Sequence, residues 1–280
     1  MTFNADPALA AIMSLDSVQY ADGESELNQK ISSTPVHSLR VLTLNTHKGF
    51  SALNRNFILP ELRDAMRGLS PDIVFLQEVL GEHKLHSRRF NNWPATSQYE
   101  FLADSVWSDF SYGRNAVYPH GDHGNALLSK YPIIRYENLD VSVGMIEQRG
   151  LLHSVLKVPG PNEVHAICVH LGLRESHRRK QLQLLGKLLD NLPANAPVIL
   201  AGDFNDWRKR ADPILKDHGM IEAFVHDQGS PAKTFPARWP LLNLDRIYVR
   251  NATTHHPKAL HQKPWSHLSD HIPLTVEIRL

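Results

Sequence analysis

The feature that constrains the fold most is a short apolar run, 197–201, that stops at Gly202-Asp203-Phe204-Asn205. A run of this length, opened by a proline and closed by Gly-Asp, is typical of a buried strand whose carboxyl end presents polar side chains. If the backbone stays extended there, Asp203 and Asn205 point to the same face and can act on one small ligand. The same residues also suit a plain turn, and the motif alone does not separate the two interpretations.

Several other predicted strands lie next to an acid, an amide or an imidazole in the same manner. Ligands of open α/β sheets bind at strand ends, so we expect these side chains to converge, although each alone has an ordinary structural interpretation. The strands and their polar neighbours are 39–44 with Asn45, 73–76 with Glu78, 164–169 with His170, 244–249 with Asp245, and 274–280 with Asp270 and His271.

Two segments between the strands have helical periodicity. Residues 57–69 and 175–192 each carry apolar side chains on one side, which predicts amphipathic helices packed on a sheet. Strands and helices in a chain of this length predict one α/β domain over 37–280. Residues 1–36 are polar with little periodicity, which predicts a flexible N-terminal arm. Residues 81–123 are expected to be rich in loops and to contribute to specificity.

Composition restricts the class of partner and the compartment. The formal net charge is +1, so any contact with nucleic acid has to come from local basic clusters. The single cysteine, Cys168, excludes an internal disulfide and is compatible with a reducing compartment. The sequence shows neither a cationic secretory signal nor an apolar run long enough to span a bilayer, so we predict a cytoplasmic protein.

The polar residues at the strand ends favour a divalent cation. They offer carboxylates, amides and imidazoles without thiolates, a combination that suits Mg²⁺ or Mn²⁺ better than structural zinc. The chain has 17 histidines, but it has no cysteine pair and no His-Glu-x-x-His helix that would support a zinc site.

The chain resembles the endonuclease/exonuclease/phosphatase superfamily, which includes DNase I-like nucleases, apurinic endonucleases, neutral sphingomyelinases and inositol polyphosphate 5-phosphatases. The resemblance covers residues 39–280 and implies a DNase I-like α/β (α+β) fold. This fold is a four-layered α/β/β/α sandwich, with two mixed sheets face to face and helices outside. The motifs that carry it, in order, are Leu44-Asn45, Leu76-Gln77-Glu78, Val169-His170-Leu171, Gly202-Asp203-Phe204-Asn205, Leu244-Asp245-Arg246-Ile247 and Ser269-Asp270-His271-Ile272-Pro273.

The resemblance also implies a cation site and a base. Glu78 and Asn45, with Asp270, would hold the metal ion, which polarises a phosphoryl oxygen and offsets charge on the leaving oxygen. Asp203 would orient and deprotonate the attacking water. Asn205 would steady that water or a phosphate oxygen.

The remaining implied roles concern charge on the phosphate. Asp245 would keep His271 in its cationic form, so that the imidazolium stabilises the transition state. His170 would donate to another phosphate oxygen or assist the leaving group. Further candidates for phosphate contact, each equally suited to a fold-stabilising role, are Arg114, Asn125 and Arg149.

Two departures from the family pattern restrict the assignment. Some members carry an acid two residues after the asparagine, whereas this chain has His47, so a second metal site is not assigned. Leu44 stands where apurinic endonucleases have tryptophan, so abasic-site repair is not assigned.

The predicted enzyme is a metal-dependent phosphodiesterase, with a nuclease acting on DNA or RNA preferred. The preference depends on tryptophans next to basic residues, because such pairs can stack bases and bind backbone phosphates. The alternative is a phospholipid (sphingomyelinase-like) or small phosphoester or inositol-phosphate hydrolase, since loop aromatics could also meet a membrane surface. A non-catalytic binding protein of the same fold is disfavoured because the acids and histidines are all present. No protein partner can be inferred. The aromatic residues concerned are Trp93, Trp207, Phe235, Trp239 and Trp265.

Overall fold

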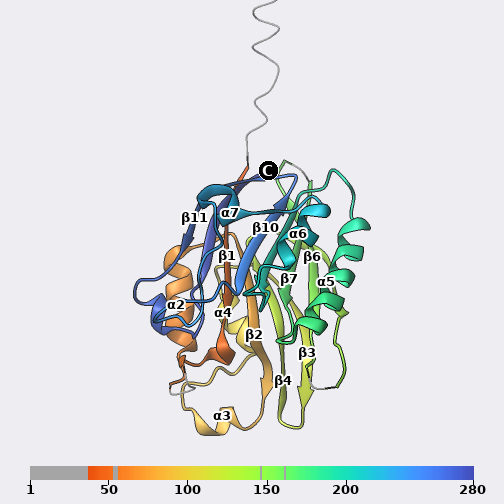
Figure 1. Ribbon diagram of the computed structural model, residues 1–280. Helices are drawn as coiled ribbons and strands as arrows, with labels where there is room; N and C mark the ends of the chain where they lie inside the picture. Colours follow the sequence, from red (N-terminus) through yellow and green to blue (C-terminus); the bar gives the residue numbers. More distant parts are fainter. Residues whose placement is uncertain (1–36, 53–55, 146, 161) are drawn as a thin grey trace, which may run out of the picture. The chain divides into compact units, whose positions relative to one another are not determined.

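The computed structural model describes residues 37–52, 56–145, 147–160 and 162–280. Two six-stranded sheets face each other and carry helices on their outer sides (Figure 1). The predicted four-layered sandwich is therefore confirmed. The predicted N-terminal arm, 1–36, lies outside the described residues.

Each sheet contains one parallel pair of strands in its interior, and all other neighbours are antiparallel. In the first sheet β1 and β2 are parallel, and in the second β7 and β8 are parallel. The first sheet has the order β11-β12-β1-β2-β4-β3, with β1 (Ser38–Asn45), β2 (Ile73–His83), β3 (Asp109–Tyr118), β4 (Gly121–Ser129), β11 (Thr253–Ala259) and β12 (Leu274–Arg279). The second has the order β5-β6-β7-β8-β10-β9, with β5 (Ile133–Asp140), β6 (Gly150–Val158), β7 (Asn162–His170), β8 (Val198–Asp203), β9 (Ile221–Glu222) and β10 (Asp245–Arg250).

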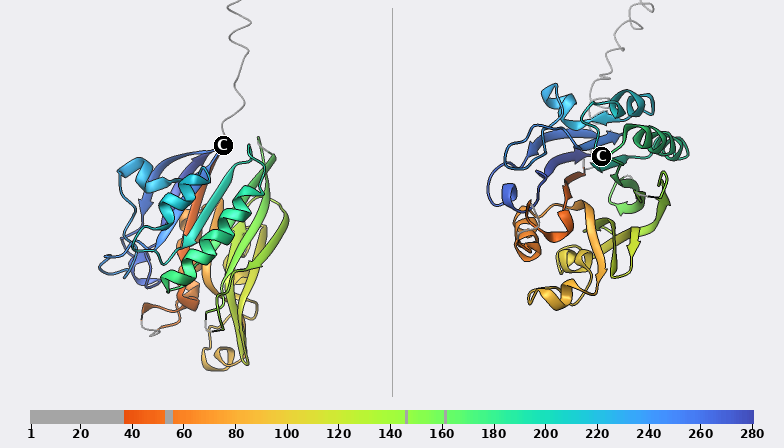
Figure 2. Two further views of the ribbon diagram at one scale, coloured as in Figure 1. Left: turned by 45° about the vertical axis from the view of Figure 1, so that its right-hand side comes forward. Right: turned by 60° about the horizontal axis from the view of Figure 1, so that its bottom comes forward.

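Helices cover the outer face of each sheet. Figure 2 shows α2 (Leu59–Leu69) outside the first sheet and α5 (Glu175–Asp190) outside the second. Both predicted amphipathic helices are confirmed, and each differs from the prediction by two residues at one end. The shorter helices are η2 (His47–Gly49), α3 (His86–Arg89), α4 (Gln98–Ala103), α6 (Ala211–Asp217), α7 (Ala223–Gln228) and η4 (Trp265–His267).

Alternation along the strands decides which residues reach the space between the sheets. On β8, Ile199 and Ala201 belong to the core between the sheets, whereas Val198 and Leu200 pack with the leucines of α5. Because side chains alternate with period two, the next residue on the inner face is Asp203. The strand that buries apolar side chains between the sheets thus delivers a carboxylate to the same space at its end.

The prediction of a loop-rich segment over 81–123 is wrong in part. β2 continues to His83, and α3, α4 and β3 all lie in this segment. β3 is an edge strand with a half-exposed, polar sequence, so it lacks the continuous apolar run that marks a central strand. The edge strand β11 was not predicted either, because Pro257 and a bulge interrupt its strand pattern. No helix in the described ranges is long and apolar enough to cross a membrane.

Candidate active site

The ends of neighbouring strands bring the predicted side chains together. Asn45 lies beside Gln77 in the β1–β2 register, and His170 lies beside Asp203 in the β7–β8 register. Asp245, the first residue of β10, is opposite Asp203. The two sheets meet here, since Asn45 Nδ2 donates a hydrogen bond of 3.2 Å to Asp203 Oδ2. Residues 158 positions apart in the chain therefore share one site.

Glu78 reaches the site through a bulge in β2. Strict alternation would point Gln77 into the space between the sheets, and its Nε2 does lie 3.2 Å from Cys168 Sγ there. The β2–β4 register shifts between Leu76 and Val79, and Glu78 has a left-handed backbone with φ 55°. An extra residue of this kind redirects a side chain, and the Glu78 carboxylate accepts a 3.4 Å hydrogen bond from Asn45 Nδ2.

The Gly-Asp-x-Asn motif combines the strand and turn interpretations. β8 ends at Asp203, and the backbone then turns instead of staying extended, with φ 51° at Asn205. Asp203 Oδ1 accepts a 2.9 Å hydrogen bond from Asn205 N. Gly202 is required because its φ is 145° and a Cβ would lie 2.0 Å from the carbonyl oxygen of Val169.

Asp245 and His271 form a buried pair next to Asp203. His271 Nδ1 lies 2.9 Å from Asp245 Oδ2, and its Nε2 lies 3.9 Å from Asp203 Oδ2. His170 Nε2 lies 3.6 Å from the same Asp203 oxygen. Asp203 is thus placed between two imidazoles. Potential ligand atoms of Asp203, Asp245 and His271 all lie within 4.8 Å of one another.

The carboxylates around His271 set the protonation states at this site. Burial alone would lower the pKa of His271, but the charges of Asp245 and Asp203 and the hydrogen bond with Asp245 outweigh it and raise the pKa to about 10. Burial raises the pKa of Asp203 to about 7, against the attraction of His271. At neutral pH the site therefore contains an imidazolium beside a carboxyl group that can exchange a proton.

The pKa values of Glu78 and His170 are both lowered, in contrast to those of Asp203 and His271. Burial would raise the pKa of Glu78, but the charges of His170 and Lys48 and the hydrogen bond from Asn45 lower it. Burial, assisted by the Arg149 charge, lowers the pKa of His170 to about 3, so His170 is neutral at pH 7. At that pH Lys48 and Asn45 therefore stabilise the Glu78 carboxylate.

A pocket of about 350 Å³ opens onto this cluster. It is lined by seven of the predicted residues and by Leu173, Trp207, Phe235, Leu242 and Leu244, of which Leu173 and Leu242 had no feature in the sequence to mark them as site residues. The predicted residues in the lining are Asn45, Glu78, Arg149, His170, Asp203, Asn205 and His271.

The other predicted residues lie outside that lining. Asp270 is adjacent to His271, and its Oδ1 lies 3.9 Å from His47 Nδ1. Arg114 lines a separate hollow, where its Nε lies 3.7 Å from Asp122 Oδ1. Asn125 is fully buried and donates to the carbonyl oxygens of Gly150 and Cys168 at 3.0 and 3.4 Å.

The donor atoms of the site fit a divalent cation bound through oxygen. Glu78 Oε1 and Asp203 Oδ2 accept hydrogen bonds of 3.4 and 3.2 Å from the same Asn45 amide, so oxygens of two carboxyl groups lie close together. Asp245 Oδ1 is buried without a hydrogen-bond partner among the described residues. Carboxylate and amide oxygens are the ligands that Mg²⁺ and Mn²⁺ prefer. The residues present therefore suit either ion.

The chain belongs to the endonuclease/exonuclease/phosphatase family, because the model of that family matches residues 42–271. Members of this superfamily are phosphoesterases and nucleases and are generally dependent on divalent metals. YbhP of Escherichia coli (strain K12), an uncharacterized protein, is 57% identical over 249 residues, which cover 88% of the chain and 98% of YbhP.

Solved structures share the fold at low sequence identity. D. rerio TDP2, complexed with a single-strand DNA product, has a TM-score of 0.63 and 17% identity, covering 87% of the chain and 99% of TDP2. The mannosyl-6-phosphatase Bt3783 of Bacteroides thetaiotaomicron VPI-5482 has a TM-score of 0.64 and 17% identity, covering 86% of the chain and 99% of that structure.

Proposed function

We propose that the protein is a divalent-metal-dependent phosphodiesterase that hydrolyses a phosphoester bond by in-line attack of water, with DNA or RNA as the preferred substrate. The observation that carries the proposal is Asp203, whose pKa of about 7 suits a general base, beside the His271–Asp245 pair. Both lie at the strand ends where a phosphate can enter from the pocket.

Asp203 accepts the proton of the attacking water in this mechanism. Asn205 Nδ2 uses one of its two hydrogens on the Leu171 carbonyl oxygen at 2.9 Å, which leaves the second hydrogen and Oδ1. Asn205 can therefore accept a hydrogen from the attacking water or donate one to a phosphate oxygen. A positioned general base accelerates such a step by about 10² to 10⁴-fold.

His271 and His170 serve the phosphate in different protonation states. The His271 imidazolium stabilises the negative charge on the phosphoryl oxygens in the transition state, an effect of about 10² to 10³-fold for one well-placed donor. Neutral His170 can donate one hydrogen bond to a second phosphate oxygen. A cation held by Glu78 and Asn45, with Asp270 as the further predicted ligand, would polarise a phosphoryl oxygen and offset charge on the leaving group.

The alternative, a phospholipid or small phosphoester hydrolase, is supported by the apolar rim of the pocket. Leu173 and Trp207 are 68% and 49% exposed at its mouth, where they could meet acyl chains as well as bases. One fold neighbour is a sugar phosphatase and another is bound to a DNA product, so fold alone favours neither substrate.

The test is hydrolysis by the purified protein with Mg²⁺ or Mn²⁺ of plasmid DNA, RNA, phospholipid vesicles and inositol phosphates, with Asp203→Ala as control. We expect nucleic acid to be cleaved and the variant to be inactive. Cleavage of lipid or inositol phosphate alone would select the alternative, and no cleavage of any substrate would contradict the proposal.

A further inference from the structure

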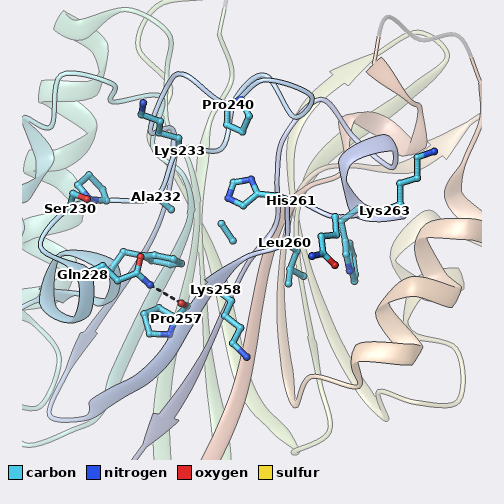
Figure 3. Close-up of a pocket in the computed structure, with 15 residues that line it drawn as sticks. Gln228, Ser230, Ala232, Lys233, Pro240, Pro257, Lys258, Leu260, His261 and Lys263 are labelled. Atoms are coloured by element: carbon cyan, nitrogen blue, oxygen red, sulfur yellow. Dashed lines mark hydrogen bonds between the residues drawn. The ribbon is translucent and has the colours of Figure 1, made fainter.

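A second, larger hollow lies between the segment 231–242 and the end of β11. Its volume is about 810 Å³. Figure 3 shows Lys233, Lys258 and Lys263 on different sides of it, around His261. On one side of the hollow, Gln228 Nε2 donates a hydrogen bond of 2.9 Å to the Pro257 carbonyl oxygen. We call this cavity the lysine hollow.

The charge of the lysine hollow distinguishes it from other cavities. It has three lysines in its lining and, among the described residues, no carboxylate. None of the three ammonium groups pairs with a carboxylate in the described part of the chain. Four other cavities each include at least one acid in their lining: Glu82, Glu175, Glu147 and Glu78, respectively. Local positive charge of this kind, in a chain of net charge +1, is the signature of an anion site.

The lysine hollow and the catalytic pocket lie on two sides of one segment. Lys233 and Pro240 line the hollow, whereas Phe235 and Leu242 line the pocket. The Phe235 ring lies 5.0 Å from the His271 ring between centroids. A substrate long enough to pass this segment can therefore occupy both cavities.

The segment is anchored directly to the catalytic residues. Thr234 Oγ1 accepts a 3.2 Å hydrogen bond from Asp245 N, and the Thr234 carbonyl oxygen accepts one of 2.8 Å from Ile272 N. Ala237 N donates 2.8 Å to the Asp270 carbonyl oxygen. These bonds fix the position of the lysine hollow relative to the cluster that would hold the scissile phosphate.

We propose that the lysine hollow binds a backbone phosphate of a nucleic-acid strand whose scissile phosphate lies in the catalytic pocket. The inference rests on the proposed function and extends it, because a second anion site serves only a substrate with more than one phosphate. A lipid surface fits less well, since the aromatic side chains that line the hollow, Phe224 and Trp265, are buried and do not reach out toward acyl chains.

The test compares two triple variants of equal charge. The first carries Lys233→Gln, Lys258→Gln and Lys263→Gln. The matched control carries Lys157→Gln, Lys187→Gln and Lys216→Gln, three lysines that line none of the cavities described above. Circular dichroism melting checks that both triple variants fold. If a triple variant does not fold, the corresponding single lysine variants are used instead.

Four measurements are made on each protein, and one of them, sedimentation with phosphatidylcholine/phosphatidylglycerol vesicles, reports lipid binding. Fluorescence anisotropy with a single-stranded oligonucleotide of about 20 nucleotides, in EDTA, reports binding without catalysis. Steady-state kinetics on the same oligonucleotide with Mg²⁺ separates KM from kcat. Hydrolysis of bis(4-nitrophenyl) phosphate, which has a single phosphorus, reports the chemistry alone.

The hollow variant is expected to raise Kd and KM for the oligonucleotide about tenfold at physiological salt, with kcat unchanged. The slope of log Kd against log salt should fall by about 0.7, since one phosphate contact to a single strand is lost. Hydrolysis of bis(4-nitrophenyl) phosphate should not change, and the control triple should match the wild type in every measurement.

Equal behaviour of the two triples in oligonucleotide binding would overturn the proposal. So would a loss confined to sedimentation with phosphatidylcholine/phosphatidylglycerol vesicles, which would assign the hollow to lipid. If no protein hydrolyses the diester but the hollow variant alone weakens oligonucleotide binding, the anion site stands and the proposed catalytic function fails. If the wild type hydrolyses the diester but both triples bind the oligonucleotide equally well, the proposed catalytic function stands and the anion site fails.

Discussion

Two buried histidines at opposite ends of the sandwich have opposite electrostatic properties. His165 and His271 are 2% and 6% exposed, so both are removed from water. His165 Nδ1 lies 2.9 Å from His153 Nε2, and burial lowers the pKa of His165 to about 4. His271 lies between Asp245 and Asp203, and its pKa is about 10. Burial favours the neutral imidazole in both, and neighbouring carboxylates alone reverse the outcome at His271.

The same strand contributes to both environments. His165 and His170 lie on opposite faces of β7, because Val164, Ala166 and Cys168 belong to the core between the sheets, whereas Ile167 and Val169 pack with the leucines of α5. At the carboxyl end of β7, His170 lies beside the carboxylate of Asp203. Near the start of β7, His165 lies beside another imidazole, that of His153. The difference separates a cluster that can move protons and charge from a pair that is kept neutral.

Of the substitutions considered, replacement of Asp203, in the charged cluster with His271, should have the largest effect on catalysis. Asp203→Asn keeps the shape but removes the proton acceptor, so kcat should fall about 10³-fold. The folded-state pKa of Asp203, about 7, is above the ordinary 3.8, so its ionisation destabilises the fold as pH rises through that interval. The variant should therefore be at least as stable as the wild type in urea at pH 8. Activity within tenfold of the wild type would contradict the role of Asp203 as base.

Asp245→Asn should remove the charge that keeps His271 cationic. We expect kcat to fall about 10²-fold and the alkaline limb of the pH–rate profile to move to lower pH. Glu137→Gln is the matched control, because it removes a carboxylate 3.3 Å from His153, the partner of His165 in the neutral pair. An alkaline limb unchanged in Asp245→Asn would show that Asp245 does not set the charge of His271.

The pH dependence of the wild-type enzyme should reflect the same pair. Activity should rise as Asp203 loses its proton near pH 7 and fall as His271 loses its proton near pH 10. The rate at pH 6 should be about tenfold below the plateau, since about a tenth of a base of pKa 7 is ionised there. An acid limb near the ordinary carboxyl pKa would argue against Asp203 as the base.

Replacing His165, in the neutral histidine pair, should change the stability of the fold and not catalysis. The folded-state pKa of His165 is about 4, below the ordinary 6.5. Its contribution is therefore complete above pH 6.5 and is lost as pH falls from 6.5 through 4. His165→Gln should flatten the loss of urea midpoint over this interval and leave kcat unchanged. A variant with the same acid sensitivity as the wild type would remove His165 from this account.

Arg114→Ala should have the smallest effect, since Arg114 pairs with Asp122 outside the catalytic pocket. Hydrolysis of a small diester should change by less than about twofold, because exposed ion pairs contribute little. Arg149→Ala is the comparison, because Arg149 lines the pocket and donates to the Leu171 carbonyl oxygen at 3.3 Å. A larger loss for Arg114 than for Arg149 would reverse the assignment of phosphate contacts.

Much of the site could be predicted because strand alternation and strand ends leave a pattern in the sequence. Asp203 and His170 follow apolar runs whose period places them on the inner face. Glu78 was predicted from its position, but the bulge that turns it into the site depends on pairing with β4, which the local sequence does not encode. Asn125 illustrates the converse, since only its buried bonds to Gly150 and Cys168 reveal a structural role.

The features that escaped prediction depend on contacts distant in sequence. The segment 231–242 is irregular, and only its bonds to Asp245, Asp270 and Ile272 place Phe235 in the pocket. The lysine hollow joins this segment to β11, an edge strand with no apolar run. Neither connection follows from the local pattern, because each is formed by tertiary packing.

The most direct measurement is hydrolysis of bis(4-nitrophenyl) phosphate in ¹⁸O-labelled water with Mg²⁺, by the wild type and by Asp203→Asn. Attack of water on phosphorus predicts that the label appears in the phosphate monoester, with turnover by the wild type and almost none by the variant. Label in the released nitrophenol, equal turnover by both proteins, or no turnover by the wild type with Mg²⁺ or Mn²⁺ would contradict the account.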